Sequence, residues 1–373
     1  MKKILVLGCT GSIGRQTIDV VRNMNEDFSI CGLVAGHNKT ELDALCSEFN
    51  CQGVLFSRDG RARIKTLVET CGADIAVNGI AGAAGLEPSI FVLENGIDLA
   101  LANKESVVMA WDLIKAISKR TNAKILPVDS EHSAIFSLLQ QCKNENVSSI
   151  IITASGGPFR TFTQEQLKNV NLEQALKHPT WAMGNKITID SASLANKGLE
   201  VIEACRLFSM PTENVKVVVH PQSLVHSLVQ TKDGMLYAQI SEPDMRHPIL
   251  TALTWPKIAE NYLKKFDLFD CEMNFFAPRY EDFPLLSLAY KCAKEMNSYP
   301  IAFNAANEVA VSAFLQKKCS FLQISEIVCA VLQNDWSKKA ESLESILDSD
   351  KMARIKAENY LKTIKNLYPG EIS

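Results

Sequence analysis

The sequence lacks three features that would each point to a particular class of protein. It has no apolar run near the roughly 18 to 20 residues that span a bilayer, which argues against a membrane protein. It has no basic excess, since its net charge is −3, which argues against general binding to nucleic acid or anionic membranes. Its 11 cysteines contain no Cys-x-x-Cys pair. Scattered cysteines in odd number are typical of reduced thiols rather than disulfides or a zinc site, so we expect a cytoplasmic protein.

Short apolar runs and helical patterns alternate along the first 128 residues. The full length of 373 residues is enough for two or three domains. Hydrophobic residues recur at helical spacing between the apolar runs, for example in Lys39–Phe49 and Ser106–Lys119. This rhythm predicts a Rossmann-type domain at residues 1–128, with a parallel sheet covered by helices on both faces. Its expected strands are Ile4–Leu7, Ile30–Ala35, Val54–Phe56, Ile75–Asn78, Leu99–Leu101 and Ile125–Val128.

The rest of the chain has a different pattern. Residues 129–254 mix strand-like runs with helices, which predicts a central α+β catalytic domain with a partly antiparallel sheet. Residues 255–282 have little periodicity and are typical of a connecting segment. Helical patterns dominate residues 283–373 and predict a C-terminal α-helical bundle. The expected strands of the central domain are Ile150–Ala154, Lys186–Ile189, Val215–Val219, Leu224–Val229 and Met235–Ile240.

A glycine-rich turn, Gly8-Cys-Thr-Gly-Ser-Ile-Gly14, follows the first expected strand and opens a helix. Glycines let backbone amides approach a pyrophosphate, and the positive end of the helix stabilises its charge. A tight strand-to-helix turn also favours glycine. The position of the turn at the start of a βαβ series nevertheless favours dinucleotide binding.

The end of the second expected strand indicates which dinucleotide binds. NAD enzymes usually carry an acid there for the ribose hydroxyl. The segment from Gly36 to Thr40 has no acid, and its His37, Asn38 and Lys39 can donate to an extra phosphate. The segment therefore predicts NADPH, the alternative being a basic surface loop.

Three carboxylates predict a divalent metal. Asp129 and Glu131 follow the last strand of the first domain, at the edge where open α/β sheets bind ligands. Together with Glu200 they offer three oxygen ligands to a hard ion such as Mg²⁺ or Mn²⁺. The alternative for Asp129 and Glu131 is a helix N-cap with an acid in the first turn.

The segment before Glu200 is rich in groups that bind phosphate. Ser191 and Ser193 precede Asn196 and Lys197, and a helix that opens near Asn196 places both of these donors beside Glu200. The turn Thr153–Pro158 resembles another anion-contacting loop, although small residues also suit a plain turn. We interpret residues 178–184 as a mobile lid whose Trp181 and Met183 shield the site from water, or else as an ordinary surface loop.

Several strings in the chain resemble the 1-deoxy-D-xylulose 5-phosphate reductoisomerase family. They run in order from the first strand to the C-terminal helices, and several are long and specific. They are GCTGSIGRQTIDV, LANKES, PVDSEH, ASGGPFR, HPTWAMGNKITIDSASLANKGLE, HPQSLVHS and NAANEVAV. The resemblance implies an NADPH- and metal-dependent enzyme of the non-mevalonate isoprenoid pathway, a homodimer inhibited by the phosphonate fosmidomycin. Its substrate would be a small phosphorylated sugar, 1-deoxy-D-xylulose 5-phosphate, and its product 2-C-methyl-D-erythritol 4-phosphate.

By matching position, the resemblance also implies the roles of individual residues. The metal ligands would be Asp129, Glu131 and Glu200, and these would be catalytic together with Lys104 and His178. The substrate would be bound by Lys104, Ser130, Glu131, Ser155, His178, Ser191, Asn196, Lys197 and Glu200. The cofactor would be bound by Thr10, Gly11, Ser12, Ile13, Gly36, His37, Asn38, Asn103, Glu105 and Gly184.

Two departures from the family pattern and two rival functions accompany this interpretation. His37 stands where many members have lysine or arginine, and Leu194-Ala195 replaces a pair that often includes methionine. One rival is an NADPH dehydrogenase that needs no metal, and the other is a non-catalytic NADPH sensor. Neither rival has a use for three acids beside a phosphate-binding segment.

Overall fold

The computed structural model describes residues 1–181 and 183–367. Contacts divide the chain into two compact units. Of the described residues, unit 1 comprises 1–107, 111–137 and 244–266, and unit 2 comprises 108–110, 138–181, 183–243 and 267–367. Within the described residues, we find no helix that combines the length and the apolar character needed to cross a membrane.

Unit 1 is built on a parallel sheet with the strand order β3-β2-β1-β4-β5-β6. All the strands expected for it are present, which confirms the predicted fold class; the main shift is at Phe56, which opens a helix rather than ending β3. The strands are β1 (Lys2–Leu7), β2 (Phe28–Ala35), β3 (Gln52–Leu55), β4 (Ile75–Asn78), β5 (Asp98–Leu101) and β6 (Ile125–Pro127).

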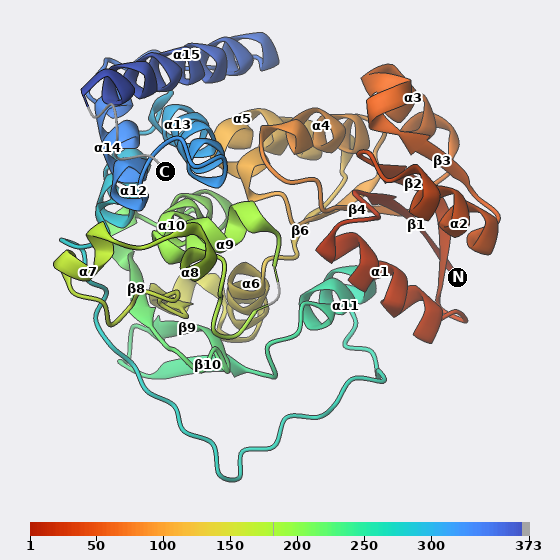
Figure 1. Ribbon diagram of the computed structural model, residues 1–373. Coiled ribbons are helices and arrows are strands. Elements are labelled where there is room, and N and C mark those ends of the chain that lie inside the picture. The colour runs from red at the N-terminus through yellow and green to blue at the C-terminus, as the bar shows by residue number, and fades with distance from the viewer. Residues whose placement is uncertain (182, 368–373) are drawn as a thin grey trace. The chain divides into compact units, whose positions relative to one another are not determined.

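Helices cover both faces of this sheet because successive strand residues point to opposite sides. Ile4 and Val6 of β1 lie in one buried cluster with residues of α1, α2 and α11. On the other face, a Cβ on Gly32 would lie 3.3 Å from the Leu67 side chain of α3. Figure 1 shows α1 and α11 on one side of the strands and α3 and α4 on the other. The helices of this unit are α1 (Ser12–Asn23), α2 (Lys39–Phe49), α3 (Phe56–Thr70), α4 (Leu86–Glu94) and α11 (Arg246–Thr254), while α5 (Lys104–Thr121) and α6 (Ser130–Cys142) have residues in both units.

Unit 2 combines a mixed sheet with a set of helices. Its strand order is β10-β9-β7-β8; β7 and β8 are parallel, and β9 is antiparallel to both β7 and β10, as predicted for a partly antiparallel sheet. The strands are β7 (Val147–Ala154), β8 (Val215–Val219), β9 (Val225–Thr231) and β10 (Leu236–Ile240). The main helices are α9 (Asn185–Ala192), α10 (Ala195–Leu207), α12 (Pro284–Glu295), α13 (Tyr299–Leu315), α14 (Phe321–Leu332) and α15 (Leu343–Leu367).

One predicted strand is wrong. Residues Lys186–Ile189 form part of helix α9 and not a strand. The run Lys-Ile-Thr-Ile is too short for its periodicity to separate a strand from a buried helix. The helix is favoured because Lys186 pairs with Asp190 one turn later, while Thr188 and Ile189 are buried.

The two units divide the chain differently from the four segments expected from the sequence. Helix α11, assigned by sequence to the central segment, packs on α1 in unit 1, and α12 packs on α10 in unit 2. The connecting segment 255–282 has residues in both units. Whether the chain divides at residues 128, 254 and 282 into domains that fold independently stays a prediction.

Candidate active site

In the glycine-rich turn of unit 1, backbone segments lie unusually close to one another. Gly8 has φ +87°, and its Cβ position lies 3.1 Å from the backbone of Gly79. A Cβ on Gly14 would lie only 2.3 Å from the carbonyl oxygen of Gly8, so no larger residue fits there. Gly11 is the N-cap of α1, and among the described residues no side chain caps this helix. The first-turn amides at Ser12 and Ile13 therefore suit an anionic ligand such as a pyrophosphate.

The segment after β2 lies on the surface. His37, Asn38 and Lys39 are exposed, and Gly36 is half-buried. Asn38 is the N-cap of α2, where its side chain accepts a hydrogen bond from the amide of Glu41 at 3.2 Å. Glu41 escaped the sequence analysis, although the spacing Asn-x-x-Glu is that of a capping box and could have revealed it.

Asn103 organises the carboxyl ends of β4 and β5. Its side chain caps α5 by accepting from the amide of Ser106 at 3.0 Å. Its Nδ2 donates to the carbonyl oxygens of Ile80 and Gly82 at 2.7 and 2.8 Å, and to Glu105 Oε2 at 2.9 Å. Asn103 and Glu105 are 2% and 5% exposed, so a buried network holds two of the predicted cofactor contacts.

Asp129 is an ionised carboxylate tied to a lysine. Lys104 Nζ lies 2.9 Å from Asp129 Oδ2, and both side chains are almost fully buried. Burial alone would raise the pKa of Asp129, but the charge of Lys104 and the hydrogen bond from His132 outweigh it and hold the pKa well below its usual range. Asp129 Oδ1 also accepts the amide of Glu131 at 3.2 Å, so the alternative role as a helix cap is realised at the start of α6. Ser130 donates its hydroxyl to Glu131.

In unit 2, His178 joins two of the predicted substrate contacts. Its Nε2 lies 3.0 Å from Ser155 Oγ and 3.1 Å from Ser191 Oγ. Its Nδ1 accepts hydrogen bonds from the amides of Thr180 and Trp181 at 3.2 and 2.9 Å. Burial lowers the pKa of His178 to about 4, so the ring is neutral at pH 7. Because Nδ1 only accepts, the single proton sits on Nε2 and faces the two serine hydroxyls.

The donors predicted beside Glu200 lie on one face of α10. Asn196 Nδ2 donates to Glu200 Oε1 at 2.5 Å, and Lys197 Nζ pairs with Glu200 Oε2. Glu200 is 0% exposed and Lys197 4% exposed. The helix spacing thus brings amide, ammonium and carboxylate together as expected, while their roles toward a ligand stay predictions.

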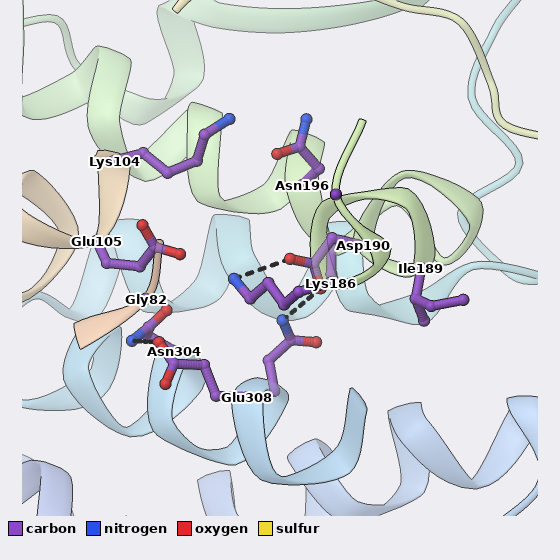
Figure 2. Close-up of polar contacts among 12 residues, drawn as sticks. Gly82, Lys104, Glu105, Lys186, Ile189, Asp190, Asn196, Asn304 and Glu308 are labelled. Atoms are coloured by element: carbon purple, nitrogen blue, oxygen red, sulfur yellow. Dashed lines mark hydrogen bonds and ion pairs between the residues drawn. The ribbon is translucent and has the colours of Figure 1, made fainter. Parts of the chain in front are cut away.

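A buried network fixes the helix that carries Ser191. Asp190 pairs with Lys186 Nζ at 2.9 Å, as Figure 2 shows. Asp190 also accepts a hydrogen bond from Asn307 Nδ2 of α13 at 2.8 Å. Asp190 is 1% exposed and Asn307 0% exposed. Asn307 lies in the family-like string NAANEVAV, but its contact with Asp190 spans 117 residues and so leaves no local pattern in the sequence.

The predicted lid is only partly described, since Ala182 lies outside the described residues. Trp181 is half-buried, with its ring centroid 6.3 Å from that of His226. Gly184 is the N-cap of α9, where its carbonyl accepts the amide of Thr188 at 3.1 Å. The roles of Trp181, Met183 and Gly184 stay predictions.

Comparisons with known proteins identify the family. Sequence profiles of 1-deoxy-D-xylulose 5-phosphate reductoisomerase match residues 4–64 and 56–111, and profiles of its C-terminal domains match residues 125–208 and 240–356. The enzyme of that name from Treponema denticola is 46% identical over 363 residues, covering 95% of each chain. The one from Treponema pallidum is 47% identical over 362 residues, covering 95% of this chain and 96% of the relative. The chain belongs to the 1-deoxy-D-xylulose 5-phosphate reductoisomerase family.

Solved structures of the family have the same fold. A DOX-P reductoisomerase in complex with NADPH, fosmidomycin and magnesium superposes with a TM-score of 0.90 at 34% identity, covering 98% of this chain and 99% of that one. The Zymomonas mobilis enzyme in complex with NADPH gives a TM-score of 0.88 at 38% identity, covering 96% and 99%. The resemblance stated from the sequence and the mixed α/β fold class are thereby confirmed.

The low pKa of His178 predicts a pH dependence of stability. The unfolded chain takes up a proton near pH 6.5, whereas the folded ring does so only near pH 4. Between these values the unfolded state binds more protons, so stability falls as the pH is lowered from 7 to 5. Over this range the free energy of unfolding of wild type should fall by about 1 kcal/mol more than that of His178→Gln. This figure is reduced to allow for the partial exposure of the ring.

Thermal unfolding at several pH values measures this loss. The exposed His37→Gln variant controls for the removal of an imidazole. If stability falls equally with pH in wild type and in His178→Gln, the ring of His178 is not held neutral.

The contact between Asp190 and Asn307 predicts a rescue by exchange of the two side chains. Asn307→Asp places two buried carboxylates together and should destabilise unit 2 by about 2 to 4 kcal/mol. The double variant Asp190→Asn/Asn307→Asp restores an amide–carboxylate hydrogen bond and should recover more than half of that loss. Thermal unfolding of both single variants and the double variant forms the cycle. Additive losses would mean that the two side chains do not act as a pair.

Proposed function

We propose that the protein converts 1-deoxy-D-xylulose 5-phosphate into 2-C-methyl-D-erythritol 4-phosphate, with NADPH and Mg²⁺ or Mn²⁺. It is thus an NADPH-dependent oxidoreductase and isomerase of the non-mevalonate isoprenoid pathway. The observation that carries this function is family membership along almost the whole chain, with 46% identity to the 1-deoxy-D-xylulose 5-phosphate reductoisomerase of Treponema denticola. The cofactors expected from the sequence agree with the NADPH and magnesium of the solved relatives.

The dinucleotide would lie at the carboxyl edge of the parallel sheet in unit 1. The close-packed Gly8–Gly14 turn and the uncapped start of α1 fit its pyrophosphate, which supports contacts from Thr10 to Ile13. The Gly36–Asn38 segment, in which His37 and Asn38 are exposed, follows the neighbouring strand β2 and fits the adenosine end. Asn103, Glu105 and Gly184 complete the proposed cofactor contacts.

Asp129, Glu131 and Glu200 would hold the metal ion. All three offer the oxygen atoms that Mg²⁺ and Mn²⁺ prefer, and the low pKa of Asp129 means that it is ionised at any physiological pH. Asp129 and Glu200 each have a lysine of their own unit as counter-ion, Lys104 and Lys197. When bound, the metal supplies Lewis-acid polarisation of a substrate oxygen.

The remaining site residues bind and orient the substrate. Ser155, Ser191, Asn196 and Lys197 would hold the phosphate, whose binding energy positions the reacting end. His178 would donate its Nε2 proton, which already faces two of these hydroxyls. Lys104, Ser130 and Glu131 would contact the sugar hydroxyls, and Trp181 and Met183 would shield the site as a lid.

Replacing Glu200 tests the metal site. Glu200→Gln keeps a hydrogen-bonding side chain beside Asn196 but removes a charged ligand. Metal-dependent turnover should fall by about a hundredfold or more. The melting temperature should also fall, because the buried Lys197 ammonium loses its carboxylate partner, so turnover is measured at a temperature where the variant is folded. The assay follows NADPH oxidation with 1-deoxy-D-xylulose 5-phosphate, with added metal, with EDTA and with fosmidomycin.

The matched control is Glu213→Gln, an exposed acid of the same unit. Full turnover in excess EDTA would favour the metal-independent dehydrogenase instead. Tight NADPH binding without any turnover would favour the non-catalytic sensor.

We also propose that the protein is a homodimer, and that it is cytoplasmic as expected from its cysteines. Strand β10 is an edge of the sheet in unit 2, and its Leu236, Tyr237 and Ile240 are 53%, 46% and 37% exposed. Such an apolar edge is suited to pairing with another chain. Sedimentation should give twice the mass of the 41.2 kDa chain, and Tyr237→Lys should shift the mass toward the monomer. A monomer at micromolar wild-type concentration would contradict this proposal.

A further inference from the structure

A carboxylate lies beside the segment expected to bind the adenosine end of the cofactor. Glu41 Oε1 lies 2.7 Å from Arg15 Nε, and Oε2 lies 2.7 Å from Arg15 Nη2. The same Oε2 accepts a hydrogen bond from Asn38 Nδ2 at 2.7 Å. One acid therefore engages both an arginine of α1 and the amide of a predicted cofactor contact.

These three residues lie close to the glycine-rich turn. The amides of Gly8 and Cys9 both donate to the carbonyl of Val34 at 2.8 and 2.9 Å, which ties the turn to the end of β2. Arg15 directly follows Gly14, the last glycine of the turn. Burial raises the pKa of Cys9 to about 12, and the negative charge of Glu41 contributes to this rise. Arg15, to which Glu41 is bound, donates its own backbone amide to the carbonyl of Gly11 in the turn at 2.9 Å.

At this edge of a dinucleotide-binding sheet, an acid favours NAD and a cation favours NADP. An acid accepts from the ribose 2′-hydroxyl of NAD, whereas an arginine accommodates the 2′-phosphate of NADP. The planar fork of arginine matches phosphate oxygens as well as it matches a carboxylate. A 2′-phosphate and Glu41 therefore compete for the same two donors, Arg15 and Asn38.

We propose that Arg15 is the cation that binds the 2′-phosphate and that Glu41 is its internal competitor, so that this pair sets the preference between NADPH and NADH. The inference rests on the proposed use of NADPH and assigns its selectivity to an ion pair that lies outside the Gly36–Asn38 segment and contacts it through Asn38. Arg15 is 61% exposed and Glu41 26% exposed. Exposed ion pairs contribute little stability, so a phosphate can displace Glu41 at small cost. Two further cations near this segment have acidic partners of their own: Lys39 pairs with Asp43, and Arg58, next to Ser57 whose amide donates to the Gly36 carbonyl, pairs with Asp59.

The chain contains a matched control for this pair. Arg22 and Glu48 form the same bidentate contact at 2.6 Å, also across 26 residues and also between α1 and α2. This second pair lies two helical turns further from the glycine-rich turn. If both pairs only hold the two helices together, their substitution should affect nucleotide binding equally. If Arg15 binds the 2′-phosphate, only substitution of Arg15 and Glu41 should change the preference between NADPH and NADH.

The test measures nucleotide binding in Arg15→Met, Glu41→Gln, Arg22→Met and Glu48→Gln. Titration calorimetry gives Kd values for NADPH and NADH, and for the fragments 2′,5′-ADP and 5′-AMP, which differ only in the 2′-phosphate. Arg15→Met should weaken NADPH and 2′,5′-ADP about tenfold or more, with NADH and 5′-AMP within about twofold. Glu41→Gln should tighten NADPH several-fold and weaken NADH. Arg15→Lys, which keeps the charge but not the fork, should be intermediate.

The two control variants should leave the NADPH to NADH ratio of Kd values unchanged within about twofold. An equal effect of Arg15→Met on both cofactors, or the same change in Arg22→Met, would overturn the assignment. If wild type binds and oxidises NADPH but the ratio of Kd values for NADPH and NADH does not change in the Arg15 and Glu41 variants, this inference alone fails. If wild type binds neither nucleotide, the proposed function itself fails.

Discussion

A buried carboxylate must have a cation or several donors beside it, and the candidate site depends on this constraint. In unit 1 Asp129 has Lys104, and in unit 2 Glu200 has Lys197 and Asn196. Asp190, next to Ser191, has Lys186 and Asn307. Each acid is thereby held in one orientation, which is what a ligand to a hard metal ion or a support for a phosphate site requires.

The scaffold of the site follows from ordinary local rules. Capping by Asn38 and Asn103 starts the helices that follow β2 and β5, which places polar groups at the carboxyl edge of the parallel sheet. In unit 2 the turn after β7 is tight enough that a Cβ on Gly157 would lie 2.9 Å from the carbonyl oxygen of Ser191. The small residues of this turn therefore let Ser155 come within reach of His178 and Ser191.

Much of this arrangement could be predicted from the sequence, because it depends on periodicity and short spacings. The strands of the parallel sheet, and the position of Asn196 one helical turn before Glu200, are of this kind. The strand predicted at 186–189 is wrong because four residues with three β-branched side chains fit a strand as well as a helix. The pairing of Arg15 with Glu41 and that of Asp190 with Asn307 join residues 26 and 117 positions apart, and no local pattern encodes such contacts. The predicted roles of residues toward ligands came mostly from family resemblance, since spacing alone does not distinguish a helix cap from a metal ligand at Asp129.

The single proton of His178 has a consequence for how the site would respond to an incoming anion. Nε2 can direct its hydrogen toward only one of Ser155 and Ser191 at full strength, because both oxygens lie at nearly equal distance. The two hydroxyl rotors are therefore linked: whichever serine accepts from the imidazole keeps its own hydrogen available for the ligand, while the other is left to reorient. Changing from one arrangement to the other moves only hydrogen atoms. The hydroxyl groups can therefore orient toward a bound anion without any shift of the backbone.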